Sequence, residues 1–266
     1  QIEEAMLRLA ADYCHLPAPD EPLADEQAVL ALAERWLQAA CPQWLMGWRR
    51  NARATDERTT IATVMPMSAQ GDSVFLWLVD ESIQAVQSAA LLGNLGCLPL
   101  DFVARQKVGG VNFSFYYFKQ LPILPPDRYT EADLAFIVPR VLELTYTARD
   151  LQLWAEELVS VWKTETGDWK PGTPEAIRRS PLTPFPYDPD RRAILRAELD
   201  AYYARLYGLT EEELRYILDP ADVMGEDYPS ETFRVLKEKE IREYGEYRTR
   251  RLVLEAWGRV NLGALV

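Results

Sequence analysis

The chain has 266 residues and a formal net charge of −12, and 48% of its residues are hydrophobic. This length and apolar content predict one large or two small globular domains and exclude a disordered chain. The apolar runs are short and interrupted by charge, so no transmembrane helix is predicted. Acidic residues near the start of the chain argue against a signal peptide, and the absence of a starting Met indicates a piece of a longer polypeptide or a processed chain.

The first 126 residues combine expected helices and strands. Apolar spacing predicts helices at Ile2–Tyr13, from Asp25 to about Cys41, and at Ser82–Arg105. Trp44 and Trp48 are four residues apart, which suits a further helical turn or a packed corner. Runs of β-branched, alternating or aromatic residues predict strands at Thr59–Val64, Val74–Val79 and Val111–Phe118.

Residues 127–266 are expected to be almost wholly helical. The predicted helices lie at Glu131–Val161, Asp190–Tyr207, Ser230–Tyr244 and Tyr247–Val260, with a proline-rich connector at Gly167–Pro189. Thr210 and Glu213 have the spacing of a capping box. The fold class predicted is therefore α+β, with an α/β region at 1–126 and a helical region at 127–266.

Cysteine and histidine usage offers no metal or redox site. Cys14, Cys41 and Cys97 are too far apart for a metal knuckle, and an odd number argues against a full disulfide framework. His15 is the only histidine, so it has no histidine partner for a ligand set or a proton relay. We expect reduced thiols, no metal site and a cytoplasmic protein.

Two segments carry residues suited to DNA. Gly47–Arg58 contains Arg49, Arg50, Asn51, Arg53 and Arg58, and arginine reads guanine bidentately while asparagine reads adenine. The alternative is a solvated loop whose arginines pair with the acids next to them. A further run places Arg105 and Lys107 before Gly109 and Gly110, followed by Asn112 and Lys119.

The second run also has two interpretations. The cations suit a helix C-terminus, and the glycines would supply a left-handed cap. Alternatively, the glycines let the backbone approach a phosphate or a base beside the cations. The aromatic residues of Val111–Phe118 are expected to be core rather than a platform for stacked bases, and Arg248, Arg250 and Arg251 to form a solvated or docking face.

The acidic charge is unevenly distributed. Residues 40–125 contain seven Lys and Arg and six Asp and Glu, a net charge of +1, which leaves −13 for the rest of the chain. The acid load therefore lies outside the segment predicted to face DNA, and a basic neighbour would be needed for tight binding.

Three stretches in this order resemble the C-terminal target-recognition region of large N6-adenine DNA methyltransferases of fused type II restriction-modification and phage-exclusion systems. They are Gly47–Thr59, Asp101–Pro122 with its Arg-Gln-Lys-Val-Gly-Gly and Lys-Gln-Leu-Pro motifs, and Tyr216–Arg250. The family's Asn-Pro-Pro-aromatic signature and its Gly-rich cofactor loop have no match here.

The resemblance implies a DNA specificity module without catalytic residues. It further implies double-stranded DNA and the catalytic domain of the same polypeptide as partners, with S-adenosylmethionine bound by that parent enzyme and no cofactor in this chain. The competing hypothesis is an acidic helical scaffold for protein interactions that binds no DNA, supported by the net charge of −12 and the acidic second half.

Overall fold

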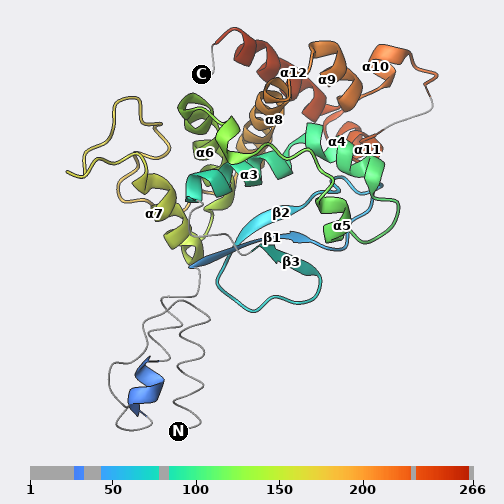
Figure 1. The fold of residues 1–266 in the computed structure, drawn as a ribbon. Coiled ribbons are helices and arrows are strands. Elements are labelled where there is room, and N and C mark those ends of the chain that lie inside the picture. Colours follow the sequence, from blue (N-terminus) through green and yellow to red (C-terminus); the bar gives the residue numbers. More distant parts are fainter. Residues whose placement is uncertain (1–26, 33–42, 78–83, 229–231, 264–266) are drawn as a thin grey trace. The chain divides into compact units, whose positions relative to one another are not determined.

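The computed structural model describes residues 27–32, 43–77, 84–228 and 232–263 (Figure 1). The chain divides into two compact units, Gln1–Gln43 and Trp44–Val266. In the first unit, residues 27–32 are helical, as predicted for the segment that follows Asp25. The expected helix at Ile2–Tyr13 lies outside the described residues, as do Cys14, His15 and Cys41.

The second unit begins with a three-stranded antiparallel sheet in the order β2-β1-β3. Its strands are β1 (Trp44–Arg49), β2 (Ala62–Pro66) and β3 (Val74–Trp77). The expected helical turn at Trp44 and Trp48 is wrong, because residues four apart also share one face of a strand. At the centre of β1, Gly47 lies opposite Thr63 and Leu76, and a Cβ there would lie only 2.4 Å from the Phe75 carbonyl oxygen.

The strand predicted at Thr59–Val64 begins three residues later. The backbone N–H groups of Thr59 and Thr60 donate to Asp101 at 2.9 and 2.6 Å instead of to a neighbouring strand. A carboxylate that accepts two successive amides satisfies them as a strand partner would. Pairing with β1 therefore starts only at Ala62.

The long helix predicted at Ser82–Arg105 is two helices, α3 (Ala85–Gly96) and α4 (Leu98–Lys107), which bend by 61° at Cys97. Pro99 is tolerated in the first turn of α4, where its missing N–H would have no helical partner. No single helix in the described ranges is long and apolar enough to span a membrane, and only the bent pair α3 and α4 together has the length and composition for it.

The strand predicted at Val111–Phe118 is wrong. Asn112 forms one bridge with Asn51, and the chain then turns into the short helix α5 (Phe115–Phe118). In a helix, residues three apart share a face, so Phe115 and Phe118 both contact Trp48, with ring centroids 4.7 and 4.6 Å away. The expectation that Phe113, Phe115 and Tyr117 are core is confirmed for Phe113, which is fully buried, but it is wrong for Phe115, which is 43% exposed, and Tyr117 is only half-buried.

The remaining regular elements described in this unit are helices, which confirms the α+β fold class, and the predicted connector at Gly167–Pro189 is irregular up to the start of α8 (Figure 1). The predicted Glu131–Val161 helix is interrupted at Tyr146, and the Thr210–Glu213 capping box is present. The elements in chain order are η1 (Pro126–Arg128), α6 (Glu131–Thr145), η2 (Arg149–Leu151), α7 (Gln152–Ser160), α8 (Pro189–Leu206), α9 (Glu211–Leu218), α10 (Ala221–Met224), α11 (Arg234–Tyr244) and α12 (Arg248–Asn261).

The hydrophobic core crosses residue 126. The larger cluster joins the sheet and α3 to α6, α7 and α8, and it buries Trp48, Trp154 and Tyr203. The second cluster lies among α8, α9, α11 and α12 and takes in Leu98 from α4. Because both clusters draw on α8 and on the α3–α4 pair, the segments of the second unit before and after residue 126 share one packed interior.

Candidate nucleic-acid interface

Two of the segments predicted to face DNA lie side by side. Asn51 pairs with Asn112, the Ala52 amide donates to the Val111 carbonyl at 3.1 Å, and the Phe113 amide donates to the Arg50 carbonyl at 2.7 Å. These bonds hold the end of β1 and the loop after it against the segment that follows α4. We call residues 49–56 and 107–112 together the candidate DNA face.

An open hollow of about 640 Å³ lies on the candidate DNA face. Its lining combines charged, polar and apolar groups, namely Arg49, Asn51, Ala52, Arg53, Asp56, Ser73 and Val111. Asn51, Arg53 and Asn112 are exposed there. The hollow therefore presents hydrogen-bonding side chains of the kinds that read base edges and phosphates.

The loop that carries Arg53 is fixed by its own backbone. Asp56 accepts a hydrogen bond from the Arg53 amide at 3.3 Å and one from the Arg49 guanidinium at 3.2 Å, and its own amide donates to the Arg53 carbonyl at 3.1 Å. Thr59 Oγ1 also donates to that carbonyl, at 3.0 Å. The base of Arg53 is thus held in place, which lowers the entropy lost if its side chain binds a ligand.

The cations of this region differ in what they already bind. Arg50 pairs with Asp72 at 2.6 Å, and the Lys107 ammonium lies 3.5 Å from the Gln120 amide oxygen. The side chains of Arg53 and Lys119 are exposed and make no ion pair with any residue that the structure describes. Neither side chain would have to give up an ion pair with a described residue to bind an anion.

The glycine turn does not have the predicted left-handed cap. The residue that ends α4 is Val108, with extended backbone, and its amide closes the helix onto the Ala104 carbonyl at 3.0 Å. Gly109 and Gly110 have no positive φ, and an added Cβ would meet no atom within 4 Å at either position. The cap interpretation was wrong because Val108 already ends the helix. Neither glycine is required by the backbone or by packing.

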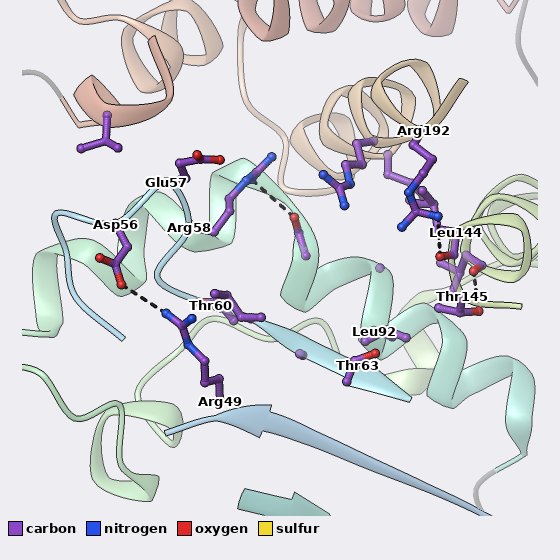
Figure 2. A pocket seen from close by; sticks show the side chains of 18 of the residues that line it. Arg49, Asp56, Glu57, Arg58, Thr60, Thr63, Leu92, Leu144, Thr145 and Arg192 are labelled. Carbon is purple, nitrogen blue, oxygen red and sulfur yellow. Dashed lines mark hydrogen bonds and ion pairs between the residues drawn. The ribbon is translucent and has the colours of Figure 1, made fainter. Parts of the chain in front are cut away.

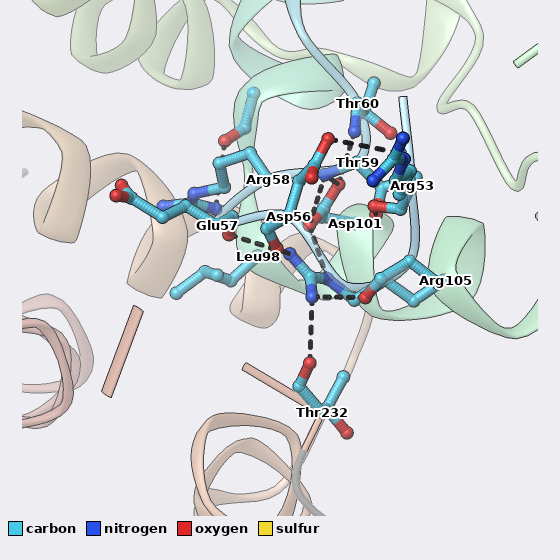
Figure 3. Close-up of polar contacts among 12 residues, drawn as sticks. Arg53, Asp56, Glu57, Arg58, Thr59, Thr60, Leu98, Asp101, Arg105 and Thr232 are labelled. Atoms are coloured by element: carbon cyan, nitrogen blue, oxygen red, sulfur yellow. Dashed lines mark hydrogen bonds and ion pairs between the residues drawn. The ribbon is translucent and has the colours of Figure 1, made fainter. Parts of the chain in front are cut away.

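Arg105 is buried in a hub of backbone carbonyls and is not part of the exposed face (Figure 3). Its side chain is 4% exposed, and its Nε donates to Asp101 at 3.0 Å. The remaining donors are directed at four carbonyl oxygens, those of Ala54, Asp56, Glu57 and Thr232, at 2.6 to 2.9 Å. A guanidinium has five N–H donors, so none is left for a phosphate.

Arg58 lines a cleft bounded by β2, α3, α6 and α8, which borders the candidate DNA face and shares Arg49 and Asp56 with the hollow there (Figure 2). Its guanidinium lies 3.5 Å from the buried Asp200 carboxylate. Burial alone would lower the pKa of Arg58, but attraction by Asp200 and Asp101 outweighs it and raises the pKa. Sequence reasoning missed Arg192 and Arg196, which line the same cleft, because both come from α8, far along the chain.

The arginine cluster at the start of α12 is neutralised within the chain. Arg248 pairs with Asp190 at 2.8 Å, Arg250 pairs with Asp222, and Arg251 pairs with Glu246 at 2.9 Å. These arginines tie α12 to neighbouring segments, so the cluster adds little net positive charge to the surface.

Metal and thiol chemistry find no support among the residues that the structure describes. No group of three His, Cys, Asp or Glu side chains is placed there to hold a metal ion. The Cys97 thiol is buried, and this burial raises its pKa, so the reactive thiolate is disfavoured.

No protein-family model, curated protein or solved structure matches the chain.

Proposed function

We propose that this chain is the DNA target-recognition module of an adenine-specific methyltransferase or fused restriction-modification enzyme in the cytoplasm. The chain would read duplex DNA, and a catalytic domain of the same polypeptide would bind S-adenosylmethionine and flip the target adenine. The resemblance of three sequence stretches motivates the family, and the candidate DNA face supplies the physical argument.

The observation that carries the proposal is the pairing of residues 50–52 with residues 111–113. It brings the arginine- and asparagine-containing loop beside the glycine turn, although about 60 residues separate them in the sequence. Gly109 and Gly110 have neither strained backbone nor crowded surroundings. The fold itself therefore gives no reason for glycine at these two positions. Close approach of a DNA backbone or base would give one, because glycine has no side chain to obstruct it.

The expected division of labour on the face follows from side-chain chemistry. Arg53 stands on a loop held by hydrogen bonds, its guanidinium binds no acceptor in the described part of the chain, and it suits bidentate reading of one guanine. Lys107 sits beside the glycine turn and offers a compact ammonium suited to a phosphate. Arg53 would therefore specify sequence, and Lys107 would position the duplex.

The direct test is selection of bound sequences from a pool of random DNA duplexes by the 266-residue chain. We expect an enriched motif. Arg53→Ala should relax one base position of that motif, at a cost of about 1–3 kcal/mol for the preferred base, while Lys107→Ala should weaken all sequences by similar factors. Arg178→Ala is the matched control, because Arg178 is an exposed arginine in the connector that does not line the hollow.

The acidic scaffold hypothesis gives a different result in the same experiment. If no sequence is enriched over the starting pool at low salt, the chain is not a recognition module. If a motif is enriched but is unchanged by Arg53→Ala, Arg53 is only a solvated surface residue, and the residues that read the bases lie elsewhere.

A further inference from the structure

The cleft bounded by β2, α3, α6 and α8 has a volume of about 750 Å³ (Figure 2). Sites for organic ligands commonly have volumes of about 300–1,000 Å³, so the cleft is large enough for a small molecule. It shares Arg49 and Asp56 with the hollow on the candidate DNA face, and its other lining residues are its own.

Two arginines that line the cleft have N–H donors without an acceptor in the described part of the chain. Arg192 and Arg196 are one turn apart on α8, so their side chains lie on the same face of the helix. Arg192 donates one hydrogen bond, to the Leu144 carbonyl at 2.9 Å, and its buried Nε has no acceptor within the described residues. Arg196 has no hydrogen bond or ion pair there at all.

The acids around the cleft are already paired. Asp56 binds Arg49 at 3.2 Å, and Glu57 binds Lys239 at 2.9 Å. Asp200, one turn after Arg196 on α8, lies 3.5 Å from Arg58; it also attracts Arg196, although no ion pair joins the two within the described residues.

The positive charges of Arg192 and Arg196 are therefore not balanced by an ion pair. Partial burial, followed by repulsion from Arg58 and Arg192, lowers the pKa of Arg196 and outweighs the attraction of Asp200. An anion between these arginines would offset this repulsion.

The Thr60 hydroxyl gives an independent indication of a ligand. Thr60 lines the cleft and is 4% exposed, and its Oγ1 has no hydrogen-bond partner among the described residues. Its backbone N–H is already used by Asp101, so the hydroxyl is the group still to be satisfied. Buried hydroxyls in folded proteins are nearly always hydrogen-bonded, so the Thr60 hydroxyl is available to water or to a molecule bound in the cleft.

We propose that the cleft binds a phosphorylated organic molecule of the size of a nucleotide. The phosphate would lie against Arg192 and Arg196 and accept a hydrogen bond from Thr60. A phosphate monoester carries about −1.5 to −2 charges, which matches the two unbalanced guanidinium groups. The apolar side chains of Leu92, Val141, Leu144 and Leu199 form walls for the organic part.

Calorimetric titration of the full chain tests the proposal with deoxynucleoside monophosphates and a sugar phosphate as probes. Inorganic phosphate and deoxyadenosine are titrated beside them. We expect at least one phosphorylated probe to bind saturably at one site, more tightly than inorganic phosphate, and deoxyadenosine not to bind. The proposal is overturned if no phosphorylated probe saturates, or if inorganic phosphate binds as tightly as every organic probe.

Variants test the residues. Arg196→Ala breaks no internal bond and should weaken binding about tenfold or more, because it removes charge-assisted hydrogen bonds. Arg191→Ala is the control, since Arg191 is on the same helix but binds Glu143 outside the cleft. Thr60→Val should also weaken binding without loss of thermal stability, whereas an idle hydroxyl would leave the affinity unchanged.

The two proposals fail separately. Arg196→Ala should leave selection of DNA sequences unchanged, and Arg53→Ala should leave binding of the phosphorylated probe unchanged. Unchanged probe affinity after both Arg196→Ala and Thr60→Val would overturn the cleft proposal alone.

Discussion

At the scale of single residues, the arginines divide by what their guanidinium groups bind. Arg105 directs all five donors into the protein. Arg53 is exposed, and only its backbone groups form hydrogen bonds within the described residues. Hydrogen bonds from Arg105 connect residues 54–57 and Thr232 to α4, and its guanidinium lies 4.5 Å from the centre of the Phe233 ring. It thereby holds the loop on which Arg53 stands.

Replacing Arg105 should destabilise the whole protein. Arg105→Ala leaves the Asp101 carboxylate and several carbonyls buried without this partner, and loss of one member of a buried pair costs about 3–5 kcal/mol. Urea denaturation followed by circular dichroism measures the free energy of unfolding. The control Arg49→Ala removes a more exposed ion pair and should cost at most about 1 kcal/mol. Equal losses of unfolding free energy in the two variants would contradict this structural role of Arg105.

Asp222 gives a stability difference that depends on pH. Hydrogen bonds from Arg215, at 2.7 Å, and from Arg250 lower the pKa of Asp222 to about 2. The unfolded value is about 3.9, so this stabilisation is complete above about pH 4 and is lost as the pH falls toward 2. Asp222→Asn should therefore be less stable than the parent chain at neutral pH, and the gap should close on acidification.

The measurement is the free energy of unfolding of both chains across this range of pH. Asp227→Asn is the control, because Asp227 is exposed and has no ion pair in the described part of the chain. A gap for Asp222→Asn that stays constant down to pH 2 would show that the two arginines do not stabilise the ionised carboxylate.

At the scale of elements, the sequence predicts helices of the second half best. α8 and α12 begin and end within one or two residues of their predicted bounds, because the Asp188 cap of α8 and the apolar face of α12 are local properties. The aromatic run at 111–118 was misassigned because Phe115 and Phe118 pack on Trp48, and that contact depends on a strand more than 60 residues earlier.

The same distinction holds for the candidate site. Local composition identified Arg49, Arg53 and the glycine turn, and the structure brings them together. Local composition could not show that Arg105 is buried by carbonyls from a distant loop, nor that Arg58 shares a cleft with Arg192 and Arg196. Those placements are set by tertiary contacts, which leave no local pattern in one sequence.

Packing of α3 against α8 gives a test at this scale. A Cβ on Gly93 would lie 3.0 Å from the Tyr203 hydroxyl and 3.3 Å from a Val141 methyl group. Tyr203 cannot move away freely, because it donates a hydrogen bond to the Ala90 carbonyl at 2.6 Å. Gly93→Ala should therefore destabilise by about 1–2 kcal/mol, although alanine favours helix by about 1 kcal/mol.

Gly96 is the matched control at the end of the same helix. An added Cβ there meets no atom within 4 Å, so Gly96→Ala should be neutral or slightly stabilising. Thermal denaturation of both variants gives the comparison. The close approach of α3 and α8 is refuted if Gly93→Ala is as stable as Gly96→Ala.

At the scale of the whole molecule, the charge distribution limits how DNA can bind. The chain has a net charge of −12, while residues 40–125 have a net charge of +1, and several of their cations are already paired. Few phosphate contacts are therefore available, and long-range attraction is weak. We expect modest affinity from this chain alone, with the remainder supplied by the other domain of the proposed parent enzyme.

The most direct measurement is the affinity of the chain for duplex DNA between about 50 and about 200 mM salt. The account predicts measurable binding at low salt that falls as salt rises, with a slope of about 0.9 for each phosphate contact. Lys119→Ala should reduce the slope by about 1, and Arg178→Ala should leave it unchanged. No binding at low salt, or an affinity that does not change with salt, would contradict the proposed role in DNA recognition.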